Sequence, residues 1–343
     1  MKTTRIFLLL AVVAGVFIIA IGIGSVYVPP GDILSVIAYR IFGAGDTPDR
    51  NTMAIVWSLR LPRALLAFIV GAALAVSGAI MQSVLRNPLA SSYTLGVSSG
   101  ASLGAAFVLF AGIPFFANVA LPFSGFIFGM LTIVLVILMA AKMDGRMDNN
   151  TIILVGMVLS LFVNSITTLL MALHRESAQQ LIFWQMGSFS MHSRRDWSTV
   201  ALLAVVAFIG VMLALRYHRE MDIMTFGEEQ AQLMGINLRQ VKWILLIIAA
   251  AITGSAIAFV GIIGFVDLVA PHVVRRIFGS RHRLIIPLSA IFGGAFMMLC
   301  DLVARTIISP NELPVGVVSA LVGAPFFGYV YFSKGRGTKS AKA

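Results

Sequence analysis

The chain has few cysteines and few charges, and it lacks the common nucleotide and metal motifs. Of its 343 residues, one is cysteine and 11% are charged. The lone Cys300 excludes an internal disulfide and any metal site built from several cysteines. No Gly-x-x-x-x-Gly-Lys-Ser/Thr loop and no His-Glu-x-x-His motif is present, and the five histidines are scattered. We therefore expect no enzymatic activity, no bound metal and no cofactor in this chain.

Long apolar runs fill most of the sequence. Apolar residues make up 59% of it, which is more than a soluble domain can bury but which lipid can accept. A helix needs roughly 20 apolar residues to cross a membrane. The segments that meet or approach this length are 6–26, 61–84, 93–112, 114–141, 151–173, 197–215, 241–264, 284–308 and 314–332. The sequence therefore predicts an all-α, polytopic membrane protein, with residues 1–343 forming a single transmembrane domain.

The distribution of positive charge favours ten crossings over nine. The additional crossing is 265–278, which is too short to span alone, so we expect a partial or re-entrant helix shielded by its neighbours. Lys and Arg near spans favour the cytoplasm. With ten crossings and an inside N-terminus, 17 of the 25 Lys and Arg lie inside, whereas nine crossings leave 10 there. Both termini are then cytoplasmic, and we expect the basic tail 334–343 to be disordered.

Two other interpretations of the positive charge are weaker. The net charge of +11 does not indicate nucleic-acid binding, because the positive residues lie at span ends and in the tail, where membrane insertion alone requires them. Segment 6–26 follows Lys2 and Arg5 like a signal peptide, but it is long and no small-residue cleavage site is evident. We expect it to be the first span.

An internal repeat is visible at an offset of 183 residues. It matches four positions in the first half of the chain with four in the second: Gly71, Gly78, Pro88 and Gly96 with Gly254, Gly261, Pro271 and Gly279. An offset of five spans would invert the second copy relative to the first, as in many transporters. Chance matches are easy in a glycine-rich chain, so the repeat is a hypothesis.

A polar segment, 216–242, separates the two apolar halves between spans six and seven. Gln230 to Met234 can form a short helix that Gly235 ends. An ordinary interfacial helix is the simpler interpretation. The length of the segment and its two glycine stops favour a shaped docking element for a soluble partner that moves the spans. The residues of interest here are Gly227, Glu228, Ala231, Leu233, Met234 and Gly235.

Three arginines are further candidates for functional residues. Arg60 and Arg63 open span two on the outer side, after an outer connection 27–58 with a predicted short helix near 33–41. They are either interfacial residues or a basic pad for an acidic partner. Arg305 reaches the same surface, four residues after Asp301, a spacing that suits an ion pair within one helix.

Span five carries a polar stripe at a spacing of four residues: Gly156, Ser160, Asn164 and Thr168. The stripe could line a translocation path, or it could join helices through hydrogen bonds, and the sequence does not decide between the two.

Several of these motifs together resemble the permease subunits of bacterial metal-chelate ABC importers, the FecCD type of type II importer, which carry ferric siderophores, haem and cobalamin. The matching segments cover essentially the whole chain: Leu59-Arg-Leu-Pro-Arg63, Gly71-Ala-Ala-Leu-Ala-Val-Ser-Gly78, Asn87-Pro-Leu-Ala90, Leu95-Gly-Val-Ser-Ser-Gly-Ala101, Trp184-x-x-Gly187-Ser188, Pro271-His272, His282-Arg283, Asp301-x-x-x-Arg305, Glu312-Leu-Pro-x-Gly316 and Gly323-Ala-Pro-Phe326. Four positions depart from the pattern. Ser91 stands where an acidic residue is usual and Ser92 where a proline is usual, so we expect these serines to cap span three differently. Asp267 stands where a glycine is common, and Arg281 stands where an acidic residue often precedes His-Arg.

The resemblance implies a homodimer in the bacterial cytoplasmic membrane, with the pathway between the two copies and two ATPase subunits bound to the polar segment. ATP and Mg would bind the ATPases. It also implies that Arg60, Arg63 and Arg305 pair with acidic residues of a periplasmic or lipid-anchored substrate-binding protein. The expected function is import of an iron chelate, a ferric siderophore, by alternating access. The alternatives are a haem or cobalamin permease, or a proton-coupled secondary transporter that uses Asp267 or Asp301.

Overall fold

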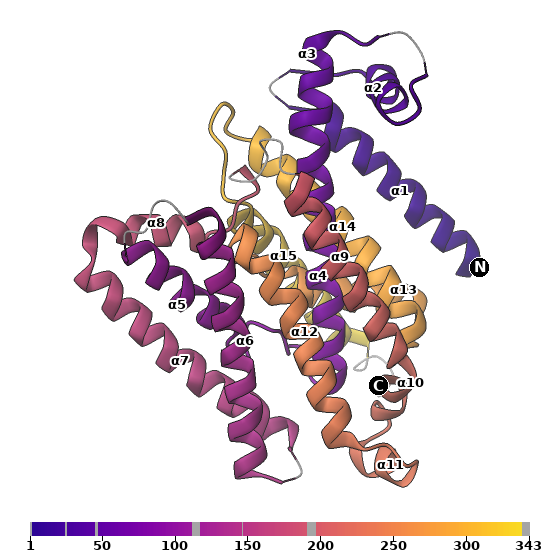
Figure 1. Cartoon of the computed structure of the whole chain (residues 1–343). Helices are drawn as coiled ribbons and strands as arrows, with labels where there is room; N and C mark the ends of the chain where they lie inside the picture. Colours follow the sequence, from indigo (N-terminus) through magenta and orange to yellow (C-terminus); the bar gives the residue numbers. More distant parts are fainter. Residues whose placement is uncertain are drawn as a thin grey trace.

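The protein is described by a computed structural model that covers residues 2–24, 26–44, 47–111, 117–145, 147–190 and 197–337. These residues form helices and their connections, so the predicted all-α fold is confirmed (Figure 1). The first half contains α1 (Lys2–Gly22), α2 (Pro30–Phe42), α3 (Arg50–Met53), the π-helix η1 (Ala54–Arg60), α4 (Leu61–Val84), α5 (Val97–Phe110), α6 (Ala117–Met143) and α7 (Asn149–Leu173). The second half contains α8 (Arg175–Gln185), α9 (Trp197–Arg216), α10 (His218–Met224), α11 (Glu228–Leu233), α12 (Leu238–Val260), α13 (Val266–Phe278), α14 (His282–Thr306) and α15 (Val315–Gly337).

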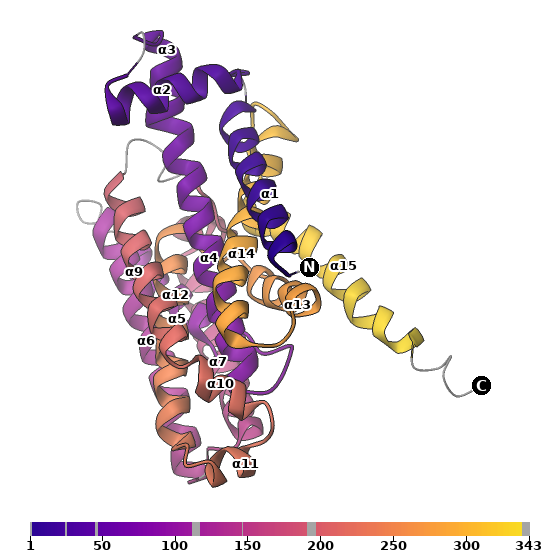
Figure 2. The ribbon, with the colours of Figure 1, turned by 90° about the vertical axis from the view of Figure 1, so that its right-hand side faces the viewer.

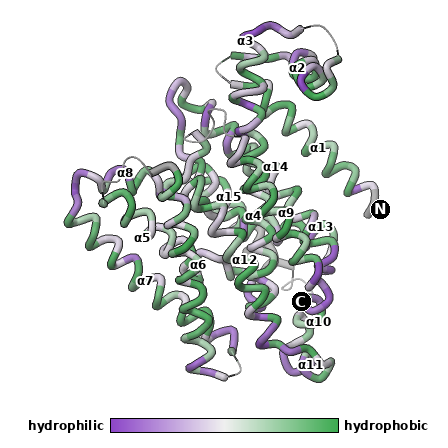
Figure 3. The backbone as a smooth tube through the Cα atoms, viewed as in Figure 1, coloured by the Kyte–Doolittle hydropathy of each residue, from purple (hydrophilic) through white to green (hydrophobic). Residues whose placement is uncertain are grey.

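The long helices are apolar along their length and polar near their ends (Figure 3). Within the described residues, seven helices are long and apolar enough to cross a membrane, and α5 and α15 contribute shorter apolar stretches. The 13-residue α13 lies where the sequence predicted a short, partial helix. The chain is thus an integral membrane protein. The count of ten crossings stays a prediction.

The helices place two polar regions at opposite ends of the bundle. Helices α2 and α3 lie at one end, and α10 and α11 lie toward the other, as Figures 1 and 2 both show. We call these the outer end and the inner end, following the side that the charge distribution predicts for each. In Figure 1, α5, α6, α7 and α8 form one group, which contacts the remaining helices through α12.

Helix α4 is the central helix, and its small residues bring it into backbone contact with two neighbours. A β-carbon on Gly71 would overlap the carbonyl oxygen of Gly293 in α14. A β-carbon on Gly78 would overlap the backbone of Asp267 in α13. Small residues permit such close approach of helices in a membrane. The small residues Gly71 and Gly78 therefore serve packing, and α4 and α14 form a tightly joined antiparallel pair.

The start of span two differs from the prediction. We expected an outer connection up to residue 58, but the helix already begins at Arg50 and continues through η1 into α4. Asp49 caps this start by accepting hydrogen bonds from the amides of Asn51 and Thr52. Pro62 has no amide hydrogen to donate, and the wider π-helical turn directly precedes it. The expected short helix near 33–41 is present as part of α2.

The local structure does not settle the predicted repeat. Gly78 lies in the middle of α4, whereas its match Gly261 ends α12. Pro88 lies in a connection, whereas Pro271 lies inside α13. These two pairs therefore occupy different positions relative to the helices, whereas Gly96 and Gly279 both lie at helix ends with positive φ angles. The repeat remains unconfirmed. The tail also differs in part, because α15 continues to Gly337; the rest of the predicted disordered tail, 338–343, lies outside the described residues.

Candidate functional site

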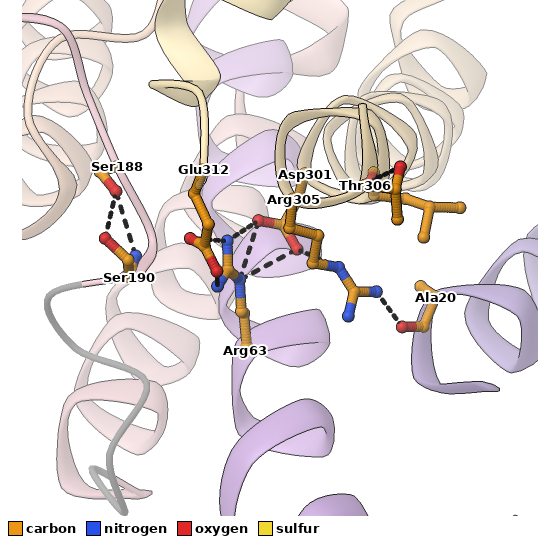
Figure 4. Close-up of polar contacts among 9 residues, drawn as sticks. Ala20, Arg63, Ser188, Ser190, Asp301, Arg305, Thr306 and Glu312 are labelled. Carbon is orange, nitrogen blue, oxygen red and sulfur yellow. Dashed lines mark hydrogen bonds and ion pairs between the residues drawn. The ribbon is translucent and has the colours of Figure 1, made fainter. Parts of the chain in front are cut away.

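A cluster of charged side chains from α4, α14 and the loop before α15 lies near the outer end (Figure 4). Arg63 is at its centre. Its Nε and Nη2 donate to Asp301 Oδ1 at 2.9 and 2.8 Å, and its Nη1 and Nη2 donate to the two carboxylate oxygens of Glu312 at 2.9 and 3.0 Å. Such bidentate, charge-assisted pairs are among the stronger hydrogen bonds in proteins. Both edges of the guanidinium are thus occupied by carboxylates of the same chain.

The other two predicted docking arginines are also partnered within the chain. Arg305 lies 3.5 Å from Asp301 in the predicted i,i+4 arrangement, and it donates to the Ala20 carbonyl at the end of α1. Arg60 donates to the carbonyls of Ile21 and Gly22 at 2.8 and 2.9 Å, and to that of Val26. These carbonyls lie at the end of α1 and just after it, where intrahelical donors are missing. Arg60 therefore ties α1 to the start of α4.

The cluster is closed rather than open. The side chains of Arg63 and Asp301 are only 11% and 3% exposed, and that of Glu312 is 37% exposed. Sequence reasoning placed Arg60, Arg63 and Arg305 at one surface, and the structure does bring them together. It predicted the pairing of Arg305 with Asp301 but missed the partners of Arg60 and Arg63, because the contacts of Arg63 join residues 238 and 249 positions apart and those of Arg60 join residues 34 to 39 positions apart. Docking to these arginines stays a prediction.

A cavity lies beside this cluster. It has a volume of about 440 Å³ and lies between α5, α8 and the loop before α15. Apolar and polar side chains both contribute to its wall, among them Leu109, Gln180, Trp184 and Glu312. Glu312 thus belongs both to the charged cluster and to the cavity wall.

The inner end carries an exposed apolar tip on the polar segment 216–242. Phe226, Leu233 and Met234 are 71%, 88% and 63% exposed there. The turns on either side of α11 need glycine, because Gly227 and Gly235 have φ angles of +132° and +82°. The predicted short helix with its glycine stop is therefore present. The sequence analysis named Leu233 and Met234 but missed Phe226.

Two other predicted residues of this segment face inward. Ala231 is buried, and Glu228 forms an ion pair of 2.8 Å with Lys242 of α12. Lys242 is fully buried and also donates to the Met147 carbonyl, in the connection between α6 and α7, at 2.7 Å. We call this the lysine tether. It joins the polar segment to the helix group that contains α6 and α7.

A second set of contacts joins the same segment to the other helix group. Asp222 of α10 accepts from the backbone amide of His282 at 2.8 Å, and its carboxylate lies 2.7 Å from His282 Nδ1. The other ring nitrogen, Nε2, lies 2.5 Å from Ser83 Oγ at the end of α4. Arg275 of α13 donates to Ser83 Oγ at 3.1 Å and also contacts Gln82. We call this the histidine tether.

The polar stripe of span five divides into two parts. Ser160 donates back to the Gly156 carbonyl at 2.7 Å, and Gly156 packs against Leu95 just before α5. Asn164 and Thr168 are exposed, and the Thr168 hydroxyl donates to the Asn164 carbonyl. The first half of the stripe therefore joins helices. Only the second half faces outward, where a path could lie. Among the residues that the structure describes, no group of three His, Cys, Asp or Glu side chains could hold a metal ion.

Comparisons with known proteins agree with this architecture. The family model of the FecCD transport family matches residues 9–333. An ABC transporter permease of Bacillus subtilis, YvrB, is 39% identical over 94% of this chain and 92% of its own length. Two further relatives are each 36% identical: the cobalamin import permease BtuC of Halobacterium salinarum, over 84% of this chain and 75% of that protein, and the Fe(3+)-citrate import permease YfmD of Bacillus subtilis, over 83% of each.

One solved structure is similar over almost the whole chain. It is described as an inward-facing conformation of a metal-chelate type ABC transporter. It superposes with a TM-score of 0.83 at 28% identity and covers 96% of this chain and 99% of the other.

Proposed function

The chain belongs to the FecCD transport family, and from this premise we propose that it is the permease subunit of an ATP-driven importer of an iron chelate, a ferric siderophore. In this proposal the chain lies in the bacterial cytoplasmic membrane with both termini in the cytoplasm. It forms a homodimer with a second copy, binds two ATPase subunits at its inner end and receives the chelate from a substrate-binding protein at its outer end. Transport proceeds by alternating access, and the chain performs no covalent chemistry.

The observation that carries this proposal is the separation of two unlike surfaces. The charged cluster lies near the outer end and the apolar tip lies at the inner end. The two are separated by helices that are long enough to cross a membrane. An importer driven by a soluble motor needs this arrangement, because cargo and motor meet it on opposite sides of the bilayer. A protein that only anchors or packs in the membrane does not need it.

The inner end fits an ATPase partner in two respects. Its exposed side chains Phe226, Leu233 and Met234 offer apolar area that another protein can cover, and burial of each would contribute about 1.5–3 kcal/mol. Beneath the tip, the lysine and histidine tethers join the polar segment to the two helix groups. A movement of the segment would therefore act on both groups together. We assign ATPase binding to the tip and coupling to the tethers.

In this proposal, the translocation pathway is lined by the exposed half of the polar stripe in α7. Asn164 and Thr168 face outward from this copy, so a second copy could complete a polar path there. Gly156 and Ser160 take part in packing against α5 instead. We therefore propose Asn164 and Thr168 as the pathway residues.

An iron chelate is the proposed cargo because the Fe(3+)-citrate relative and the metal-chelate type structure both align over most of the chain. Haem and cobalamin are the alternatives, since the cobalamin permease and the Fe(3+)-citrate permease are both 36% identical to this chain. Asp301 is poorly suited to carry protons in a proton-coupled transporter, because Arg63 and Arg305 already neutralise its carboxylate.

Reconstitution tests the proposal. The purified permease with its ATPase subunits is placed in liposomes, and uptake of a ferric siderophore, haem and cobalamin is measured with each candidate binding protein. We expect uptake of the ferric siderophore that requires ATP and the binding protein. Uptake of haem or cobalamin instead would correct the cargo. Uptake that follows a proton gradient and ignores ATP would overturn the ABC mechanism.

A further inference from the structure

Arg63 has no free edge for a partner's carboxylate. A guanidinium offers two edges that fit a carboxylate, one formed by Nε and Nη2 and the other by Nη1 and Nη2. Asp301 occupies the first and Glu312 the second. Figure 4 shows the two carboxylates on different sides of the same guanidinium. An acidic partner can therefore bind Arg63 only if one of the two resident carboxylates leaves.

The two resident carboxylates differ in access. The Asp301 side chain is almost fully buried, and Arg305 lies within ion-pair distance of it on the same helix. The Glu312 side chain is the most exposed of the cluster, and its carboxylate accepts hydrogen bonds from Arg63. Because a buried charge is costly to leave unpaired, Asp301 stays, whereas Glu312 can move into water at little cost. The exchangeable carboxylate is Glu312.

We propose that Glu312 holds the place of the docking partner's carboxylate: an Asp or Glu on the binding protein displaces Glu312 from the Nη1/Nη2 edge of Arg63. This rests on the proposed function and adds a residue to its outer site. The partner surface is acidic, because the cluster and its neighbour Arg60 of η1 together hold three arginines against two carboxylates. This leaves one net positive charge to attract an acidic surface.

The exchange would also act on the loop between α14 and α15. Glu312 lies in this loop, and the next residue, Leu313, donates its amide to the Ala304 carbonyl at 2.8 Å. Just beyond, the backbone at Gly316 packs against carbonyls of Met186 and Ile262 with no room for a β-carbon. Glu312 also lines the 440 Å³ cavity beside α8. Displacement of Glu312 therefore removes one of the contacts that hold this loop at the rim of the cavity, on the side from which cargo arrives.

The test is the affinity of docking in a Glu312→Gln variant. The permease–ATPase complex is placed in nanodiscs, and its binding to the binding protein that supports uptake by the unchanged complex is measured. Glu312→Gln removes the competing charge at nearly constant shape, and we expect docking roughly tenfold tighter. Glu176→Gln is the matched control, because Glu176 is an exposed residue of α8 outside the cluster. We expect its affinity to stay at the original value.

A second variant separates direct exchange from a general charge effect. In an Arg63→Lys background the bidentate edge is missing, so Glu312→Gln should bring no gain in affinity. An equal gain in both backgrounds would show that only overall charge matters and would overturn the proposal. So would Glu312→Gln docking that is unchanged or weaker.

Two further outcomes are distinguishable. If Glu312→Gln fails to assemble, Glu312→Asp replaces it; this side chain is one methylene shorter, and the gain should be smaller but in the same direction. If no binding protein supports uptake by the unchanged complex, the proposed function fails and the inference fails with it. If docking occurs but ignores residue 312, the inference alone fails.

Discussion

The outer and inner ends of the molecule present opposite kinds of surface. At the outer end, the charged groups of the cluster bond one another. At the inner end, the three apolar side chains of the tip are exposed, and the charged groups lie beneath them as tethers. Charged surfaces give fast, reversible and salt-dependent encounters. Apolar surfaces give stable association that salt weakens little. The difference suits a partner that comes and goes on one side and one that stays bound on the other.

The largest expected effect tests whether the inner end depends on its buried charge. Glu228→Gln should lower the free energy of unfolding by about 3 kcal/mol, because it leaves the ammonium of fully buried Lys242 without its counter-charge. Lys242→Met should cost less, about 1–2 kcal/mol, because Glu228 is 23% exposed and can be hydrated. Chemical denaturation in detergent measures both. The opposite order would mean that the tether is not held by charge pairing.

The second prediction concerns the apolar tip. Leu233→Asp should leave the fold intact, because this side chain is 88% exposed, but it should weaken ATPase binding roughly 30-fold, the equivalent of about 2 kcal/mol. Titration of the purified ATPase against the permease in nanodiscs measures the change. Tyr27→Asp, an exposed position at the outer end, is the control and should bind ATPase normally. Equal losses in the two variants would remove the tip from the interface.

The histidine tether should affect coupling more than assembly. Asp222→Asn leaves the apolar tip untouched but weakens a charge-assisted contact with His282, so ATP hydrolysis should continue while uptake per ATP falls about tenfold. Parallel assays of phosphate release and uptake in the same liposomes test this. His218→Gln alters a neighbouring histidine that contacts the Leu215 carbonyl, and it should leave the ratio unchanged. A parallel fall of hydrolysis and uptake in Asp222→Asn would assign the tether to assembly alone.

The smallest expected effect is that of salt concentration on partner binding at the two ends. Raising the salt concentration from about 0.1 to 1 M shortens the Debye length from about 10 to 3 Å. Binding-protein docking should therefore weaken several-fold, whereas ATPase binding should change little. Both affinities can be measured on one nanodisc preparation. If salt weakens the two contacts equally, the ends do not differ in the way that we infer.

Much of the fold followed from local sequence patterns. Apolar runs located the spans, and the spacing of Asp301 and Arg305 predicted a pair that the structure contains. Gly235 predicted the end of a short helix, and α11 ends two residues before it. These features depend on residues close together in the chain. Local patterns therefore carry them.

The missed features depend on distant residues. The sequence offered Arg63 as an interfacial residue or as part of a basic pad, and its partners lie more than 230 positions away. Lys242 is one of the 17 positive residues that the charge count places inside, and nothing in the local sequence indicates that it is buried against a carbonyl 95 positions away. The predicted span two begins too late, because the apolar segment starts at residue 61 whereas the helix begins at Arg50 and continues through a π-helical turn. Ser91 and Ser92 were expected to affect the cap of α5. Instead, Gly96 occupies its N-cap, and Ser92 bonds Ser77 and Thr253.

The backbone contact between α4 and α14 has a mechanical consequence. Arg63 and Ser83 lie about 30 Å apart along α4, with one in the charged cluster and the other in the histidine tether. Asp301 and His282 occupy the corresponding positions on α14. Because Gly71 and Gly293 bring the two backbones into contact, we expect the helix pair to move as one rigid unit. In the proposed transport cycle, a tilt of this pair would move its two ends in opposite directions, so that a movement imposed by the ATPase at the inner end would reach the outer face.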